Sequence, residues 1–284
     1  MTDLVYFGGR IVPRGSAAVS VDDRGFLFGD AVYEVLRVVR GRFIEPERHL
    51  RRLARSLHEV SIPGPDLDVL EVSADLLRRN RLMDAGATVY MQVSRGAAVR
   101  QHAFPPDGTA PTVLVTVSPF FPRSELLANG AAAIALPDLR WSRCDIKSVN
   151  LLPNILAAQR AAEAGAFEAI LVRDGVVTEA TRSNVFFVVQ GVVRTHPAGP
   201  FILPGVTREV VLELAAEAGL AVREEGVGAD ELYAAEEVFL TGTTADVMPV
   251  VTVDGRVVSG GRPGPVARRL GAMLAERIGV AAGR

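Results

Sequence analysis

The sequence predicts an α+β fold with two domains, a smaller N-terminal domain and a larger C-terminal domain that is rich in strands. Its 284 residues are near the upper limit for one hydrophobic core, so two cores are a reasonable arrangement. Before residue 118, periodic helical segments alternate with strand-like runs. After it, short apolar runs separated by turn residues predominate.

The boundary between the two predicted domains is the stretch SPFFPR at 118–123. Its two prolines interrupt both helix and sheet, because proline has no N–H to donate. We therefore expect a small N-terminal domain at 1–118, an interdomain linker at 119–123 and a large C-terminal domain at 124–284.

Each element of the N-terminal domain follows from a local pattern. Apolar residues at helical spacing after Pro46 predict a helix over 46–60. The polar, proline-containing stretch 95–111 is long enough to be a functional loop. The other expected elements are a hairpin with strands at 5–7 and 11–12 around Gly8-Gly9, a strand at 31–39, a helix at about 66–81, and strands at 88–94 and 112–117.

The C-terminal domain has more strands and fewer helices. We expect strands at 131–136, 169–172, 185–189, 192–195, 237–241 and 249–253, and helices at about 150–164, 207–218 and 263–278. Hairpin turns are expected at Arg173-Asp174-Gly175, Gln190-Gly191 and Val253-Asp254-Gly255.

Composition argues against several classes of function. The net charge of -2 gives no broad basic field for nucleic acid and no reason to expect an anionic membrane. No apolar run reaches the ~18 residues of a membrane span, and the N-terminus does not resemble a secretion signal. The single cysteine, Cys144, allows no intrachain disulfide, so a reducing compartment such as the cytoplasm is expected.

Lysine usage singles out one residue. Of the 31 Lys and Arg residues, all but Lys147 are arginine. Arginine replaces lysine on a surface or in an ion pair, but its guanidinium stays protonated and cannot act as an amine. Lys147 is therefore a candidate for amine chemistry such as Schiff-base formation. The alternative, that one surface lysine survived by chance, stays open on composition alone.

Two turns are candidates for binding a phosphate group. The segment 203–207, with sequence LPGVT, precedes a periodic helix, and free N–H groups at such a helix start can bind an anion with help from Thr207. An ordinary helix start without a ligand is the alternative. The segment TGTT at 241–244 forms a second turn rich in hydroxyl groups after a strand, a pattern that many turns share.

A carboxylate, Glu179, lies just before an expected strand in the stretch TEATRSN at 178–184. A carboxylate that faces a pyridine nitrogen keeps the nitrogen protonated, which makes the ring an electron sink. The alternative is a solvated glutamate in a turn. Signatures of other chemistries are missing from the sequence, including the phosphate-binding G-x-x-x-x-G-K-[ST], the dinucleotide G-x-G-x-x-G, the G-x-S-x-G elbow, and metal-ligand spacing among the four histidines.

Together these residues resemble the fold-type IV pyridoxal-phosphate enzymes, and most closely the D-amino-acid (D-alanine) aminotransferases among them. The resemblance extends from about residue 6 to 269. It is carried by DRGFLFGDAVYEV at 23–35, QVSRG at 92–96, RQH at 100–102, RWSRCDIKSVNLL at 140–152 and THP at 195–197.

The resemblance implies the two-domain fold of that family and pyridoxal 5′-phosphate as the cofactor. It implies that Lys147 is the catalytic residue that forms the Schiff base and moves the substrate proton. Glu179 would pair with the pyridine nitrogen and Leu203 would pack against the ring. The phosphate would be bound by Arg52, Val206, Thr207 and Thr243.

Substrate recognition is also implied by the resemblance. Tyr33, Arg100 and His102 match the residues that bind the α-carboxylate in the D-amino-acid enzymes, and the loop with Arg100 and His102 would come from the partner subunit of a homodimer. Arg37 lies on the same strand face as Tyr33, because side chains alternate along a strand. In branched-chain enzymes an arginine there shapes the substrate pocket. Thr181, Arg182 and Gly242 depart from the family pattern near the cofactor.

The sequence thus predicts transamination between a D-amino acid such as D-alanine and a 2-oxo acid such as 2-oxoglutarate. Three alternatives remain at this stage: an L-branched-chain aminotransferase, an aminodeoxychorismate lyase, and a cofactor-binding scaffold without catalysis.

Overall fold

The computed structural model describes residues 3–279 and divides the chain into two compact units. One unit consists of Met1–Phe121 and Ile146–Asn150, and the other of Pro122–Asp145 and Leu151–Arg284. A short segment that includes Lys147 therefore belongs to the first unit, although the chain on both sides of it belongs to the second.

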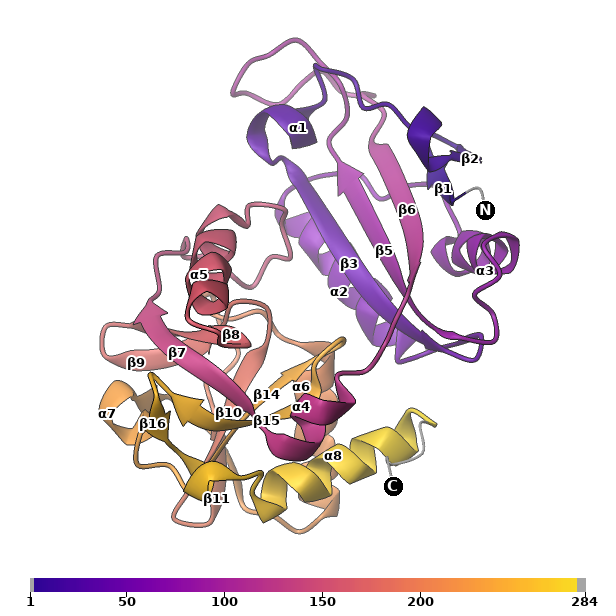
Figure 1. Cartoon of the computed structure of the whole chain (residues 1–284). Helices are drawn as coiled ribbons and strands as arrows, with labels where there is room; N and C mark the ends of the chain where they lie inside the picture. Colours follow the sequence, from indigo (N-terminus) through magenta and orange to yellow (C-terminus); the bar gives the residue numbers. More distant parts are fainter. Residues whose placement is uncertain (1–2, 280–284) are drawn as a thin grey trace. The chain divides into compact units, whose positions relative to one another are not determined.

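The first unit is built on an antiparallel sheet of six strands in the order β2-β1-β6-β5-β3-β4 (Figure 1). Its strands are β1 Leu4–Phe7, β2 Arg10–Pro13, β3 Ala31–Val39, β4 Arg42–Phe43, β5 Gly86–Ser94 and β6 Thr112–Pro119. Its helices are α1 Arg24–Phe28, α2 Pro46–Glu59 and α3 Val69–Arg79.

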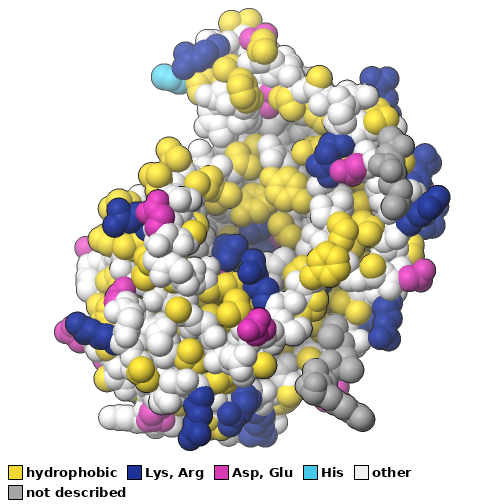
Figure 2. All heavy atoms as spheres, viewed as in Figure 1, with side chains coloured by type: hydrophobic (Ala, Val, Ile, Leu, Met, Phe, Trp, Pro, Cys, Tyr) yellow, Lys and Arg dark blue, Asp and Glu magenta, His cyan; other side chains and the backbone are white. Residues whose placement is uncertain are grey.

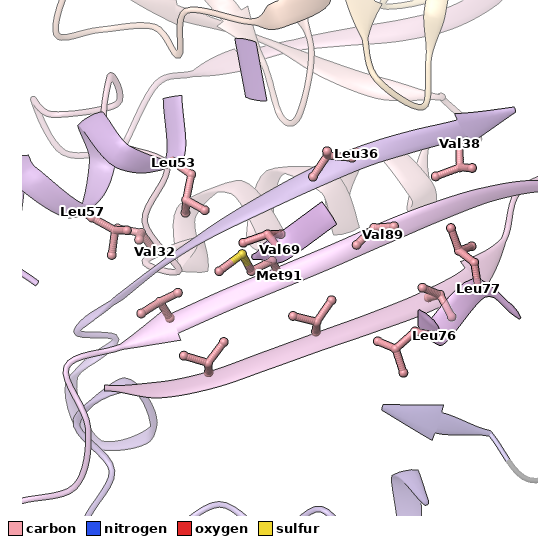
Figure 3. Close-up of a cluster of buried hydrophobic side chains, with 14 of the residues drawn as sticks. Val32, Leu36, Val38, Leu53, Leu57, Val69, Leu76, Leu77, Val89 and Met91 are labelled. Carbon is pink, nitrogen blue, oxygen red and sulfur yellow. The ribbon is translucent and has the colours of Figure 1, made fainter. Parts of the chain in front are cut away.

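Alternation along β3 and β5 gives the sheet an apolar face, which α2 and α3 cover. In β3 the even-numbered residues from Val32 to Val38 point to this face, and in β5 the odd-numbered residues from Ala87 to Val93 do so. Side chains of the two helices, among them Leu53 of α2, complete the core (Figure 3). Tyr33 and Arg37 of β3 therefore lie on the opposite face of the sheet.

The second unit is built on a mixed sheet of ten strands (Figure 1). The strands are β7 Ala131–Pro137, β8 Glu168–Arg173, β9 Val176–Ala180, β10 Asn184–Val189, β11 Val192–Thr195, β12 Val222–Glu224, β13 Val227–Gly228, β14 Glu237–Gly242, β15 Asp246–Val253 and β16 Arg256–Val257. The path runs β12-β11-β10-β14-β15-β7-β8-β9-β13, and β16 pairs with β15.

Helices pack against this sheet at two places. α5 Leu152–Glu163 packs on β7 and β8, whereas α6 Val206–Glu217 and α8 Pro265–Arg277 pack on each other and on β14 and β15. Two shorter helices, α4 Ser124–Asn129 and α7 Ala229–Leu232, complete the unit. Along the described residues, 3–279, the structure contains no helix with both the length and the apolar character needed to cross a membrane.

A buried carboxylate fixes the start of α8. Glu237 of β14 accepts the N–H groups of Val266 (2.9 Å) and Ala267 (2.8 Å), which have no partner inside the helix. Gly264 precedes them, and a Cβ at this position would lie 2.0 Å from Cδ of Glu237. Only glycine therefore lets the carboxylate reach the end of the helix.

Hairpin turns follow one backbone geometry. In five turns both central residues have positive φ, the type I′ geometry that matches the twist of paired strands. The second residue is glycine each time, which adopts this conformation without a steric penalty. The five are Gly8-Gly9, Arg40-Gly41, Asp174-Gly175, Gln190-Gly191 and Asp254-Gly255. The hairpins expected around residues 8–9, 173–175, 190–191 and 253–255 are confirmed.

The expected elements differ from the observed ones in a few places. The sequence predicts Glu179 just before the strand at 185–189, and the structure adds a strand that was not expected, β9, so Glu179 lies inside β9 and ahead of β10. The helices α1 and α4 were not expected, since both are too short to show a helical period. Pro119, expected in the linker, is the last residue of β6.

Charged side chains are scattered over the face of the molecule that Figure 2 draws. On the face drawn in Figure 2, basic and acidic side chains form small groups among apolar and neutral surface. This distribution agrees with a net charge of -2.

Candidate active site

Lys147 lies on a segment that runs beside strand β3. The N–H of Tyr33 donates to the carbonyl of Lys147 (3.0 Å), and the N–H of Val149 donates to the carbonyl of Ala31 (3.0 Å). The segment 146–150 is thus hydrogen-bonded along β3, and its backbone is fixed relative to that strand.

The side chain of Lys147 has an aromatic neighbour. Its Nζ lies 4.3 Å from the centre of the Tyr33 ring, and that ring stacks on Tyr90 with 5.6 Å between ring centres. From the α2 side, the Ser56 hydroxyl oxygen accepts the N–H of Lys147 (3.2 Å). Lys147 as a residue is half-buried.

A buried ion cluster lies between β3 and α2 in the same unit. Glu34 is fully buried and accepts from Arg52 through Nε (3.0 Å) and Nη2 (2.7 Å) and contacts Nδ1 of His49 (3.0 Å). Burial alone would raise the pKa of Glu34. The Arg52 charge and the hydrogen bonds from His49 and Arg52 outweigh it and hold that pKa well below its usual value, and Lys147 contributes in the same direction. Glu34 is therefore a permanent anion that orients Arg52.

In the second unit, Glu179 of β9 is the acceptor at the centre of a hydrogen-bond network. It forms an ion pair with Arg140, and it accepts from the Asn184 side-chain amide (3.0 Å) and from the N–H of Leu203 (3.1 Å). Burial raises the pKa of Glu179 to about 7, although Arg140 and the Leu203 N–H favour its charged form. A further positively charged or N–H partner would stabilise the carboxylate.

Arg140 is held in turn by Asp138. The Arg140 guanidinium donates to both carboxylate oxygens of Asp138, from Nε (2.9 Å) and from Nη2 (2.8 Å). The Thr178 hydroxyl donates to the same carboxylate (2.8 Å). Glu179 is thus supported by a buried chain of charged and polar groups, which fixes its orientation.

The start of α6 carries N–H groups that the chain leaves without a side-chain cap. Gly205 is the N-cap residue and has no side chain to accept from the first turn, in which Val206 and Thr207 lie. A Cβ on Gly205 would lie 2.1 Å from Oδ1 of Asn184, and the Asn184 amide also donates to the Leu203 carbonyl (2.9 Å). Asn184 therefore connects Glu179 with the turn that starts α6, where an anion can bind.

The turn with Thr243 follows β14 and lies close to the turn at 181–183. A Cβ on Gly242 would lie 3.4 Å from Oγ of Ser183. Buried Glu168 holds the turn 181–183 by accepting from the Thr181 hydroxyl (3.2 Å), the Arg182 N–H (3.1 Å) and the Ser183 hydroxyl (2.7 Å). Thr181 and Arg182, which depart from the family pattern, therefore still lie in a turn that Glu168 holds by hydrogen bonds.

The residues expected to recognise substrate divide into two groups within the first unit. Tyr33 and Arg37 lie on the same face of β3, and the Arg37 guanidinium stacks on Phe120 at 4.5 Å. Arg100 and His102 are exposed in the loop after β5. Along residues 3–279, no hydrogen bond or ring contact joins Tyr33 to Arg100 or His102, and the loop pair contacts Phe28 instead.

Sequence reasoning did not single out Glu34, Asn184, Arg140, Glu168 or Arg24 as functional. One signal was present for Glu34: it occupies an even-numbered position of β3, among the residues that form the core face. A charged residue there requires a buried partner. Asn184 and Glu168 gave no such signal, because no pattern along the chain shows that Asn184 meets Glu179 or that Glu168 meets the turn 181–183. Among the described residues, no group of three His, Cys, Asp or Glu could hold a metal ion.

Comparisons with known proteins point in one direction. Residues 31–253 match the family model described as Amino-transferase class IV. The chain is 43% identical over 279 residues to a D-alanine aminotransferase of Bacillus licheniformis, and the match covers 96% of each chain.

Among solved structures, the Escherichia coli branched-chain amino acid aminotransferase is similar with a TM-score of 0.87 and 27% identity, covering 100% of this chain and 97% of that one. The T.th. branched-chain amino acid aminotransferase, solved with pyridoxamine 5′-phosphate, has a TM-score of 0.86 and 28% identity, covering 98% and 94%.

Proposed function

Because the chain belongs to the class IV aminotransferases, we propose that it transfers the amino group of a D-amino acid such as D-alanine to a 2-oxo acid such as 2-oxoglutarate. The predicted family, its α+β fold and its cofactor, pyridoxal 5′-phosphate, are confirmed. The observation that carries the substrate class is the 43% identity to a D-alanine aminotransferase over 96% of both chains.

The groups present in each unit fit this cofactor. An aldehyde needs a primary amine, and Lys147 is the chain's only lysine. A pyridine nitrogen needs a carboxylate, and burial raises the pKa of Glu179 despite its ion pair with Arg140, so a protonated ring nitrogen would add a second cationic partner. A phosphate group needs N–H donors, and the start of α6 offers those of Val206 and Thr207.

We propose that Lys147 holds the cofactor and that Arg52, Thr207, Thr243 and the Val206 N–H bind its phosphate, with Leu203 against the ring. When bound, pyridoxal 5′-phosphate supplies an electrophilic carbon and a conjugated ring that accepts an electron pair. With the cofactor bound, the Lys147 amine would be the base that takes the proton from the substrate Cα. The Tyr33 ring beside it limits where that amine can move.

Glu179 keeps a proton on the ring nitrogen. Its orientation is fixed by Arg140 and Asn184, so its carboxylate does not need to reorganise during the reaction. The Arg140 charge also prevents the pKa of Glu179 from rising further, which keeps the carboxylate available at neutral pH.

We propose that the substrate α-carboxylate is bound by Tyr33 together with Arg100 and His102 of a partner subunit. A guanidinium, a phenol hydroxyl and an imidazole offer strong donors to a carboxylate. Both loop residues are exposed in this chain and make no contact with Tyr33 among the described residues. A loop that serves the neighbouring subunit of a homodimer accounts for both facts.

The second unit also has an exposed apolar face, which supports a homodimer. Leu152, Ile155 and Leu156 of α5 are 66%, 58% and 61% exposed. Three large apolar side chains on one helix end are typical of an interface. We also propose a cytoplasmic location, because the single cysteine, Cys144, is free and the chain has no second cysteine for an intrachain disulfide.

The second candidate is an L-branched-chain aminotransferase. It is favoured by the structural similarity to branched-chain enzymes and by Arg37, which is buried on the face of β3 that carries Tyr33. The identity to those enzymes is 27–28%, against 43% for the D-alanine enzyme, so we rank it second.

One assay separates the candidates. The purified holoenzyme is mixed with D-alanine, L-leucine or aminodeoxychorismate, each with and without 2-oxoglutarate, and cofactor absorbance and products are followed. We expect pyruvate and D-glutamate from the D-alanine mixture. Turnover of L-leucine with none of D-alanine would instead show the branched-chain activity, and conversion of aminodeoxychorismate without a 2-oxo acid would show a lyase.

A further inference from the structure

The loop that carries Arg100 and His102 rests on a buried arginine that the proposed reaction does not use. Arg24 of helix α1 is 3% exposed. Its Nη1 donates to the carbonyls of Gln101 (2.7 Å) and Ala103 (3.2 Å), and its Nη2 to the carbonyl of His102 (3.4 Å). One guanidinium thus binds three successive carbonyls in the exposed part of the loop.

Arg24 is itself fixed by a carboxylate. Its Nε donates to Asp30 (2.8 Å), and Asp30 also accepts from Arg95 through Nε (2.7 Å) and Nη2 (3.0 Å). Burial opposes ionisation of Asp30, but the hydrogen bonds and charges of Arg95 and Arg24 lower its pKa below the usual value. Arg24 therefore has no freedom to leave the loop at neutral pH.

An aromatic ring completes the support. The Phe28 ring lies 4.8 Å from the Arg24 guanidinium carbon and 5.1 Å from that of Arg100. The His102 ring meets it edge to face, with 5.8 Å between ring centres. Phe28 therefore contacts the side chains of both proposed carboxylate-binding residues, and Arg24 holds the backbone beneath them.

The start of the loop is held by backbone bonds as well. The N–H of Arg24 donates to the carbonyl of Gly96 (2.9 Å), and the N–H of Ala98 donates to the carbonyl of Asp22 (3.2 Å). A loop held only at its ends would let exposed side chains explore many rotamers. The Arg24 bonds to the backbone at 101–103, together with the Phe28 contacts to the Arg100 and His102 side chains, restrict that freedom.

From these contacts we infer that Arg24 and Phe28 are positioning residues that set the affinity for the substrate α-carboxylate by fixing Arg100 and His102. The inference rests on the proposed role of these two residues in carboxylate binding. Neither Arg24 nor Phe28 touches the reacting atoms, so the limiting rate of the chemistry should not depend on them.

The test uses the holoenzyme variants Arg24→Gln and Phe28→Leu, with Arg10→Gln as the control. Arg10 is exposed at the start of β2 in the same unit. We expect Arg24→Gln to raise KM for D-alanine and for 2-oxoglutarate together, by about 10-fold or more, with kcat within about 3-fold of wild type, because a charge-assisted carboxylate contact contributes to ground-state and transition-state binding alike. Phe28→Leu should shift both KM values in the same direction by less, and Arg10→Gln should leave them unchanged.

Hydrogen exchange gives a second readout. The peptide over 97–104 should exchange faster in Arg24→Gln than in wild type, while cofactor absorbance stays the same. Wild-type KM values in Arg24→Gln and Phe28→Leu would overturn the inference, and so would a loss of kcat with unchanged KM, which indicates a general structural defect.

The test still gives an answer if the Arg24→Gln variant fails to load cofactor or if wild type does not use D-alanine. If Arg24→Gln does not load cofactor, Phe28→Leu decides by the same criterion, since it keeps every hydrogen bond of Arg24. If wild type fails to use D-alanine, the proposed function fails by itself. The same KM comparison is then made with L-leucine, which carries the same α-carboxylate.

Discussion

At the residue scale, the chemistry depends on how each charged group is compensated. Glu34 and Glu179 are both buried carboxylates, yet their environments move their pKa values in opposite directions. Glu34 has Arg52 and His49 close by, and its pKa falls below its usual value. Glu179 has Arg140, but burial outweighs it and raises the pKa to about 7. Glu34 is a fixed structural anion, whereas a second cationic partner besides Arg140 would stabilise the charged form of Glu179.

The raised pKa of Glu179 gives a testable pH dependence in the cofactor-free protein. Between pH 4.5 and about 7 the unfolded chain loses this proton while the folded chain keeps it, so the free energy of unfolding falls as pH rises through this window. Glu179→Gln has no such proton. Between pH 5 and pH 8, we therefore expect the free energy of unfolding of wild type to fall by on the order of 3 kcal/mol relative to that of the variant.

Urea unfolding of both cofactor-free proteins at several pH values measures this difference. Bound cofactor should abolish the pH dependence, because a protonated ring nitrogen stabilises the carboxylate. Parallel stability curves for wild type and Glu179→Gln across the window would contradict the assignment.

At the scale of single elements, local pattern predicted most helices and strands. The apolar alternation of β3 and the helical period after Pro46 needed no knowledge of the rest of the chain. The elements that were missed are short. Helix α1 is five residues long, and so is strand β9, which contains Glu179 and forms a hairpin with β8. The network of Glu179 with Arg140 and Asn184 was equally invisible, because nothing local specifies which groups meet in space.

Helix α8 offers a matched pair of glycine substitutions. Gly264→Ala should destabilise the protein by roughly 2 kcal/mol or more, because its Cβ would collide with the Glu237 carboxyl that caps the helix. Gly271→Ala lies inside α8, where the Cβ would meet Val247 at an ordinary 3.7 Å. Gly271→Ala should raise the free energy of unfolding by about 0.5–1 kcal/mol, because alanine loses less backbone entropy than glycine on folding.

Thermal and urea unfolding of the two variants beside wild type check this prediction. Kinetic constants should change little in both, since α8 carries no proposed site residue. A stability loss in Gly271→Ala as large as in Gly264→Ala would mean that the helix cap is not the cause.

At the scale of the whole molecule, the chain crosses between its two units more than once. The segment 146–150 returns to the first unit and hydrogen-bonds along β3. The sequence singles out Lys147 as the chain's only lysine, but it does not predict this return, which depends on backbone pairing with a strand more than a hundred residues away.

The proposed dimer predicts complementation between two inactive variants. In Lys147→Ala the catalytic amine is missing, and in Arg100→Ala the carboxylate-binding arginine is missing. If Arg100 acts in the partner's site, a mixed dimer has one complete site. Random mixing of subunits should therefore restore about a quarter of the wild-type sites.

The experiment refolds or exchanges the two variants together and measures D-alanine turnover. Each variant alone, and the two mixed without exchange, are the controls. Activity that never exceeds the sum of the separate variants would show that Arg100 acts within its own chain or plays no part.

Reduction of the holoenzyme with borohydride shows which residue holds the cofactor, because it makes the bond between the cofactor and the amine permanent. Peptide mass spectrometry should then find one phosphopyridoxyl group per chain, attached to Lys147, with none in Lys147→Ala. A colourless protein in the presence of pyridoxal 5′-phosphate, or a label found on the chain's α-amino group and not on Lys147, would contradict the account.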